Sequence, residues 1–452
     1  MASQSREASK SSWALSALIA LMPVWWILGA ASFIWIIAAV PMAVRLLRRW
    51  PMRAPKGFGL WLLFVVWMLA SITQVEGTRY ISFGYRALLY AAVSITFLYV
   101  YNLTEEELPR AKVLKLMTLY FIYAVIGGYA GLILGETGFT SLTEMVLPSV
   151  ILDNEFARTL VHPTFAQEQD FLGFTLPRPV APFTFTNEWG SALAFLVPLV
   201  IAGWGTLGRR WQAATTLALA AGAIPIILSV NRGLWVGITI AFVYGAILLA
   251  IRGDTRYIKG LTAGVVLVVA LIFIPAINNV VAGRLESDHS NNARLTLYAQ
   301  VVDQIDDSPW FGYGAPQANE ENPNLPAVGT HGQFWTVLFS HGIPGVILYV
   351  GFSLSLAFRT LRAKDPTSTW LHVVTALVPI LMWFYELLTP PTFIVMIAGA
   401  VALRTATGPG LSPPDASLPD VRRGPTHDHS REAPTTCRPA PTGLAEVLRG
   451  PS

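Results

Sequence analysis

Seven arginines are the residues of this sequence that are best placed for chemistry, because they lie apart from its basic clusters. Out of 31 Lys and Arg residues, they are Arg79, Arg86, Arg158, Arg178, Arg232, Arg284 and Arg294. A guanidinium group is always charged, and its planar fork of donors matches the oxygens of a phosphate. The seven arginines therefore favour a site that binds an anionic group.

Three of these arginines have neighbours that suit such a site. Arg86 falls inside an apolar segment, where its side chain either snorkels to the membrane surface or faces a cavity that holds an anion. Arg232 follows Ser229-Val-Asn at a helix junction, where the N-terminal amides of the next helix also attract anions. Arg294 opens an amphipathic stretch, 292–305, and taken alone it is equally well explained as a solvated loop residue.

His331 is the candidate for proton transfer. It precedes an apolar segment, and His341 lies ten residues further along that segment. A histidine at a membrane entry is often only an interfacial residue, and this explanation is open for both. His331 is favoured for function because it lies on the same side as the unusual arginines. An imidazole there can take a proton from a hydroxyl group near neutral pH.

Several other chemistries lack their motifs in this sequence. It contains no HExxH, no Cys/His ligand spacing and no DxD pair in the segments expected outside the membrane. It also contains no Walker pattern. We therefore expect no metal and no cofactor, and we find no support for nucleotide-sugar chemistry or ATP-driven transport. The net charge of +4 follows from basic loops, so no nucleic-acid partner is expected.

The elements that must position these residues are membrane helices. Hydrophobic residues make up 53% of the chain, charged residues only 13%, and the mean hydropathy is +0.51. A span needs about 20 apolar residues. We predict an all-α integral membrane protein with about twelve spans, at residues 12–28, 30–47, 57–74, 81–101, 113–135, 187–205, 212–229, 234–251, 260–280, 340–358, 370–387 and 391–405.

The charge pattern predicts how these spans are oriented. Lys and Arg collect in cytoplasmic loops, and an even number of spans places both termini on that side. We therefore predict a cytoplasmic N-terminal tail, 1–11, a polytopic membrane domain, 12–405, and a disordered, Pro-rich cytoplasmic tail, 406–452. Two exterior loops are long, about 136–186 and 281–339, and the second is expected to be partly helical. Long loops on a rigid scaffold are common places for binding and catalysis.

Four segments carry a family resemblance. Arg178-Pro-Val-Ala-Pro-Phe-Thr-Phe-Thr-Asn187 precedes span six, and Ser229-Val-Asn-Arg-Gly233 joins spans seven and eight. Residues 294–314 show an Arg-helix-Pro-x-x-Gly-x-Gly order, and residues 331–345 show a His entry followed by Gly-x-x-Gly. In this order, with a long exterior loop between spans nine and ten, they resemble the O-antigen ligase and polymerase superfamily from about residue 80 to residue 360. Gly332 departs from the pattern, which more usually has Asn or Ser there.

The resemblance implies a GT-C-like, metal-independent glycosyltransferase of the bacterial cytoplasmic membrane. Its donor would be a glycan on polyprenyl pyrophosphate at the outer face, and its acceptor a hydroxyl group of a polysaccharide, lipid or protein. The resemblance implies that Arg232 and Arg294 clamp the diphosphate while His331 deprotonates the acceptor, with inversion at the anomeric carbon. It assigns substrate binding to Arg86, Arg178, Asn187 and Arg284.

Other functions remain open at this point. A polymerase of the same superfamily needs the same clamp and base as a ligase, and the span count and the His-containing loop favour a ligase. A secondary transporter would also have twelve spans, but with repeated halves and ionisable groups near the midplane. No clear repeat is present, and Glu386, the one carboxylate that would suit proton coupling, is better explained at the interface or paired with an arginine. A non-enzymatic scaffold gives no reason for the arginines.

Overall fold

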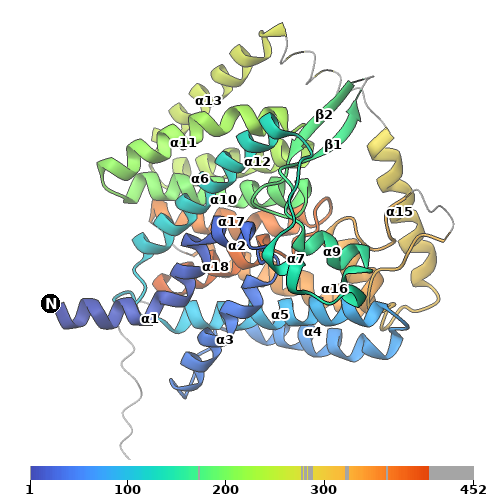
Figure 1. Cartoon of the computed structure of the whole chain (residues 1–452). Coiled ribbons are helices and arrows are strands. Elements are labelled where there is room, and N and C mark those ends of the chain that lie inside the picture. The colour runs from blue at the N-terminus through green and yellow to red at the C-terminus, as the bar shows by residue number, and fades with distance from the viewer. Residues whose placement is uncertain are drawn as a thin grey trace, which may run out of the picture. The chain divides into compact units, whose positions relative to one another are not determined.

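The computed structural model of the chain describes residues 2–171, 174–275, 289–320, 325–362 and 365–406, together with residues 278 and 282. Two predicted features lie outside these residues, namely Arg284 and nearly all of the C-terminal tail. The described part is predominantly helical (Figure 1). The prediction of a helical membrane protein is therefore confirmed.

Among the described residues, six helices are long and apolar enough to cross a membrane: α5 (Arg79–Asn102), α6 (Arg110–Leu134), α10 (Thr186–Thr206), α11 (Arg209–Leu228), α12 (Arg232–Ile251) and α16 (Gln333–Thr360). The other predicted spans coincide with shorter helices: α1 (Ala2–Ala20), α2 (Met22–Ile27), α3 (Ile34–Leu47), α4 (Phe58–Ala70) with η1 (Ser71–Gln74), α13 (Arg256–Ile272), α17 (Pro366–Leu381) and α18 (Pro391–Ala406). The count of twelve spans stays a prediction.

Helix α10 forms the centre of the bundle. It packs against α6, α17, α12 and α11. In its most apolar stretch of 18 residues, 83% of the residues are buried. A helix that is apolar on every side is stable only when neighbouring helices cover all of it. The first turn of α10, which holds Asn187 and Glu188, is therefore held rigidly inside the protein.

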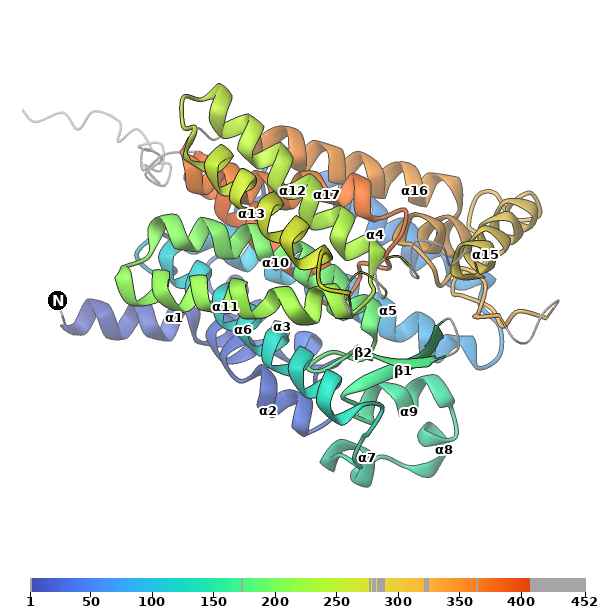
Figure 2. The same cartoon turned by 90° about the horizontal axis from the view of Figure 1, so that it is seen from above.

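The predicted exterior loops are folded. Residues 136–186 form the short helices α7 (Leu142–Val146), α8 (Ser149–Leu152) and α9 (Glu155–Val161) and an antiparallel hairpin of β1 (Ala166–Phe171) and β2 (Phe174–Pro179). The hairpin corrects the all-α prediction, and α15 (His289–Ile305) lies in the second long segment, 281–339, whose exterior position stays a prediction. Figures 1 and 2 show the hairpin, α7, α9 and α15 at the end of the bundle opposite the N-terminus. We call this end the loop end.

A kink in α16 joins the two glycine-containing motifs of the second half of the chain. Pro344 has no N–H group, so the carbonyl of Ser340 lacks its helical donor. Gly342 adopts a non-helical φ of 70°. The Gly-rich turn meets this defect, because the N–H of Gly314 donates to Ser340 O at 2.7 Å and that of Tyr313 donates to Phe339 O at 2.9 Å. The two motifs are thus one hydrogen-bonded unit.

Arg79, one of the seven arginines, is hydrogen-bonded to this same unit. Arg79 begins α5 and donates through Nη1 to the carbonyl oxygens of Tyr313 at 3.1 Å and Ala315 at 3.2 Å. His341, just before the kink, is buried, and its Nδ1 lies 2.9 Å from Ser71 Oγ. Both residues therefore stabilise the fold at the loop end.

Replacing Gly342 with Ala should lower the thermal stability of the protein. A Cβ there would approach Trp310 O to 2.3 Å at a positive φ, and backbone strain of this kind costs about 1–3 kcal/mol before the clash is added. The measurement is the unfolding temperature of the purified protein in detergent. Gly351→Ala on the same helix is the control, since its Cβ would meet only Leu60 at 3.9 Å. Equal unfolding temperatures for both variants would contradict the role of the kink.

Candidate active site

A cavity of about 440 Å³ opens at the loop end between α5, α10, the segment before α16 and the segment that joins α17 to α18. Three of the predicted site residues line it: Arg86, Asn187 and His331. They come from parts of the chain that are far apart in sequence. The structure therefore brings together a guanidinium, an amide and an imidazole that sequence reasoning selected separately.

Gln333 holds two walls of this cavity together. Its side chain is fully buried at the start of α16. Its Oε1 accepts from the N–H of Leu387 at 2.9 Å, and its Nε2 donates to the hydroxyl of Tyr90 at 2.9 Å. Its own backbone N–H donates to Tyr385 O at 2.6 Å. These bonds place His331, two residues earlier, beside the segment that carries Tyr385 and Glu386.

The hydrogen bonds of Thr330 define the state of the His331 imidazole. The Thr330 hydroxyl donates to Ala327 O at 2.6 Å, so its oxygen is left to accept from His331 Nδ1 at 3.1 Å. The proton is then on Nδ1, and Nε2 keeps a free lone pair. Burial and, as the smaller cause, the positive charge of Arg294 together lower the pKa of His331 to about 4. His331 is therefore a neutral imidazole at pH 7 that can accept a proton.

The backbone conformation at Gly332, the residue after His331, explains why a glycine stands there. Gly332 adopts a φ of 88°, and a Cβ would approach Trp383 O to 2.7 Å. A side chain at this position would therefore be strained and would push the segment 382–387 away. The departure from the family pattern at Gly332 fits the close packing of this segment against α16.

Arg86 and Glu386 form an ion pair on the cavity wall. Arg86 is buried, with 8% of its surface exposed, so it does not snorkel to the membrane surface. Glu386, which lies between α17 and α18, is the anionic partner. This pairing is the one expected for Glu386, and it leaves that carboxylate poorly suited to proton coupling.

A second cluster of polar residues surrounds the side chain of Tyr385. The hydroxyl of this buried tyrosine donates to Asn231 Oδ1, and Asn231 caps α12 by accepting from the N–H of Leu234 at 3.3 Å. A Cβ on Gly233 would meet the Tyr385 ring at 2.8 Å, which explains the glycine of the Ser/Arg-Gly junction. The tyrosine thereby fixes the start of α12, where Arg232 is the first residue.

Two further predicted arginines belong to this second group. Arg178 on β2 donates to Ser229 O at 3.1 Å and to Gln169 Oε1 at 2.8 Å. Burial lowers the pKa of Arg178 to about 10; the Tyr385 hydroxyl opposes this shift and the charge of Arg294 adds to it. Arg294 on α15 is therefore near enough to act electrostatically on both Arg178 and His331.

The site residues thus fall into two adjoining groups. The arginine group contains Arg178, Arg294 and Tyr385, with Arg232 at the helix start that Tyr385 supports. The cavity group contains Arg86, Asn187 and Glu386. His331 belongs to both, since it lines the cavity and responds to the charge of Arg294. Arg158 is exposed on α9 and joins neither group.

Sequence reasoning missed Glu188. This carboxylate lies in the first turn of α10, lines the cavity and accepts from the N–H of Thr184 at 3.0 Å. Its signal was present in the sequence, because an acidic residue at the start of an apolar span is as unusual as the arginines that were selected. Thr389, also on the cavity wall, carries no comparable signal. Among the described residues, no group of three or more His, Cys, Asp or Glu side chains could hold a metal ion.

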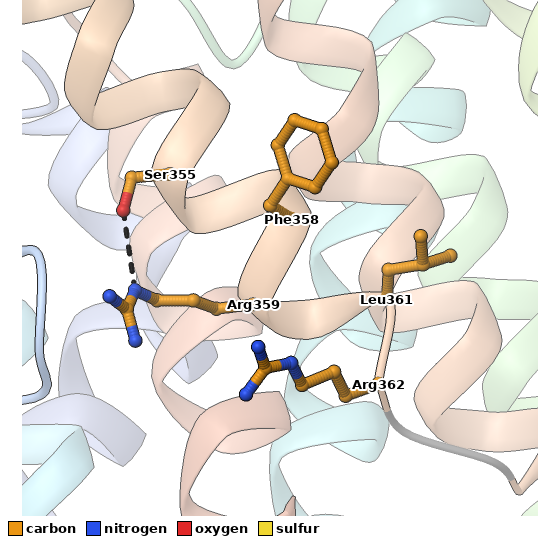
Figure 3. Close-up of a pocket in the computed structure, with 5 residues that line it drawn as sticks. All are labelled: Ser355, Phe358, Arg359, Leu361 and Arg362. Carbon is orange, nitrogen blue, oxygen red and sulfur yellow. Dashed lines mark hydrogen bonds between the residues drawn. The ribbon is translucent and has the colours of Figure 1, made fainter.

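A second cavity, of about 390 Å³, lies at the opposite end of α16 and is lined by Ser355, Phe358, Arg359, Leu361 and Arg362. Figure 3 shows both guanidinium groups on one side of the helix end, with Arg359 Nε 3.3 Å from Ser355 Oγ. It lies roughly 40 Å from His331 along the helix, at 1.5 Å per residue. Basic residues at this end are those expected from cytoplasmic loops, so we place the active site at the other cavity.

The model of the O-Antigen ligase family matches residues 217–350. The matched region runs from α11 into α16 and contains Arg232, Arg294, His331 and the kink at Gly342. No curated protein matches the chain.

Proposed function

We propose that this chain, which belongs to the O-antigen ligase superfamily by its match over residues 217–350, transfers a glycan from polyprenyl pyrophosphate to an acceptor hydroxyl group. The observation that carries the proposal is the position of His331, a neutral imidazole between the arginine group and the cavity group. A glycosyl transfer needs these two environments side by side. One receives the anionic leaving group, and the other holds the nucleophile.

On the donor side, the arginine group would bind the diphosphate. Breaking the bond between the anomeric carbon and the phosphate oxygen leaves an electron pair, and hence negative charge, on the departing polyprenyl pyrophosphate. Fixed guanidinium groups aimed at that charge stabilise the transition state. Arg294 and Arg232 would carry this role, with Arg178 held rigidly beside them by Ser229 O and Gln169.

On the acceptor side, His331 Nε2 would take the proton of the attacking hydroxyl group. The acceptor oxygen then forms a bond to the anomeric carbon from the face opposite the diphosphate, which inverts the configuration. The bond from His331 Nδ1–H to Thr330 keeps Nε2 free for this step. The loop end would face the outside of the bacterial cytoplasmic membrane, where the lipid-linked donor and the acceptor are available.

No specific observation favours a transporter. The one carboxylate considered for proton coupling, Glu386, is paired with Arg86. The charged groups of the site lie at helix ends and in the segments between helices, whereas transporters bind their ions near the midplane. Arg86 lies within the second turn of α5, still close to the loop end.

Arg294→Ala and Arg232→Ala should each abolish transfer while membrane insertion stays intact. Removing one donor that stabilises a developing anion costs about 10²–10³-fold in rate. The measurement is surface glycan in a deletion strain complemented with each variant, alongside the amount of tagged protein in the membrane. Arg158→Ala, on the exposed face of α9, is the control and should be fully active. Full activity in either of the first two variants would rule out the clamp.

The pH dependence of kcat/KM should follow the lowered pKa of His331. A base works only when it is unprotonated, and the pKa of about 4 in the free enzyme keeps His331 neutral at pH values where an ordinary histidine is charged. We therefore expect kcat/KM to stay level from pH 8 down to about pH 5 and to fall below it. A fall centred near pH 6.5 would contradict the buried, arginine-facing environment. His331→Ala should lose most of the activity, and its residual rate should lack the acidic fall.

Deleting the gene and measuring the size of lipid-linked and surface glycans would test the reaction itself. Full-length polymer that accumulates on the polyprenyl carrier would indicate a ligase, which the predicted span count and the His-containing loop favour. Single repeat units on the carrier or on the final acceptor would indicate a polymerase of the same superfamily. No change in either pool would refute glycosyl transfer.

A further inference from the structure

We infer that the 390 Å³ cavity at the end of α16 opposite the loop end binds the phosphate headgroup of an anionic phospholipid. This site is separate from the candidate active site and does not depend on the proposed function. None of its five lining residues is acidic, and two of them are Arg359 and Arg362. Three features support the inference: arginines without a carboxylate partner, a helix end that another residue caps, and an adjoining apolar stripe.

The two arginines of this cavity differ from other arginines at the same end of the bundle. Four of the others pair with carboxylates: Arg45 and Arg49 with Glu107, Arg110 with Asp365, and Arg404 with Glu105. Within the described residues, neither Arg359 nor Arg362 forms an ion pair. Two like charges on one cavity repel each other until an anion binds between them. Their planar forks of donors match the oxygens of a phosphate.

Capping of the helix does not account for these arginines. Basic side chains are common at helix C-termini because they satisfy the last carbonyl groups and favour the negative end of the helix dipole. At the end of α16, Arg252 fills this role, since its Nη2 donates to Leu361 O at 2.9 Å. Arg359 and Arg362 are thus left for another partner.

The side chain of Arg359 is held in place at one edge of the cavity. Its Nε donates to Ser355 Oγ at 3.3 Å, and a Cβ on Gly57, before α4, would approach the same Nε to 3.0 Å. Within the described residues, its two Nη groups have no hydrogen-bond partner. Figure 3 shows the side chain of Arg362 reaching back toward Arg359. The two guanidinium groups can therefore bind one phosphate together.

The surface beside the arginines suits acyl chains. Ile347, Leu354 and Phe358 are exposed, and their spacing of seven and four residues places them on one face of α16. Phe358, which is 72% exposed, also lines the cavity. A phospholipid can place its chains along this stripe and its phosphate at the arginines, whereas a soluble phosphate uses only the arginines. Basic pockets between membrane helices commonly bind acidic headgroups in this way.

The size and charge of the cavity select the headgroup. Small-molecule sites typically measure about 300–1,000 Å³, so a cavity of 390 Å³ accommodates a headgroup rather than a whole lipid. A zwitterionic lipid would bring an amine or a quaternary ammonium group, for which the lining residues offer no carboxylate. An anionic phospholipid such as phosphatidylglycerol brings the phosphate without a cation. We therefore expect the site to favour phosphatidylglycerol over phosphatidylcholine.

Native mass spectrometry of the full-length protein in a neutral detergent would test this preference. The protein is mixed with equal amounts of phosphatidylglycerol and phosphatidylcholine that carry the same acyl chains. We expect about tenfold more phosphatidylglycerol bound to the parent protein, about threefold more to Arg362→Ala, and equal amounts of both lipids on Arg359→Ala/Arg362→Ala. Phosphatidylcholine binding should be the same throughout, which checks that the variants are folded.

The matched control is Arg209→Ala/Arg210→Ala. It removes the same charge from two exposed arginines at the start of α11, at the same end of the bundle, and it should keep the tenfold preference. An equal loss in both double variants would mean a general attraction between basic loops and acidic lipids, and the site would be refuted. A parent protein without a preference, or an Arg359→Ala/Arg362→Ala protein that keeps it, would refute the site as well.

Glycerol 3-phosphate distinguishes the lipid from a soluble phosphate. It carries the same phosphate chemistry but has no acyl chains to place on the stripe of Ile347, Leu354 and Phe358. At the molar concentration of the lipid, we expect it to leave phosphatidylglycerol bound to the parent protein. Displacement of the lipid under these conditions would show that the cavity recognises soluble phosphates, and the assignment to a phospholipid would be wrong.

Discussion

Backbone groups within a membrane protein must be satisfied by the protein itself, because the hydrocarbon offers no partner. In this protein, the constraint applies above all to the carbonyl groups at the kink in α16. Pro344 and Gly342 leave the carbonyl groups of Phe339 and Ser340 without helical donors, and the turn at 312–314 supplies them. The long second loop must therefore return to the bundle, and Arg79 fastens it there. This return brings α15, and with it Arg294, near enough to His331 for the arginine charge to lower the histidine pKa.

The packing at the loop end also keeps the positive charges of the arginine group apart from the ion-paired charges of the cavity group. The arginine group gathers around Tyr385 and the start of α12, whereas the cavity group has its one arginine neutralised by Glu386. Gln333 holds the two groups at a constant spacing, since it bonds to the segment that carries both Tyr385 and Glu386. His331 thereby lies between the charge of Arg294 and the cavity that it lines, and its burial together with that charge keeps the imidazole neutral at pH 7.

Much of the fold and part of the site could be predicted from the sequence. Apolar runs and basic loops mark helices and their ends, and its place in an apolar run marks Arg86 as a candidate site residue. The β1–β2 hairpin was not predicted, because its short strands lie in a polar, Pro-containing segment without a clear alternating pattern. The pairing of Arg86 with Glu386, 300 residues apart, and the clustering of Asn187 with Thr389 depend on tertiary packing that no local pattern encodes.

The extent of the family match supports a division of labour within the site. Residues 217–350 include Arg232, Arg294 and His331, the groups assigned to the diphosphate and the proton. Five polar residues of the cavity wall lie outside it, namely Arg86, Asn187, Glu188, Glu386 and Thr389. Under the proposed function, the matched residues would bind the diphosphate and take the proton, the steps that a ligase and a polymerase have in common. The cavity residues outside the matched region would then lie on the acceptor side, where the substrates of a ligase and a polymerase differ.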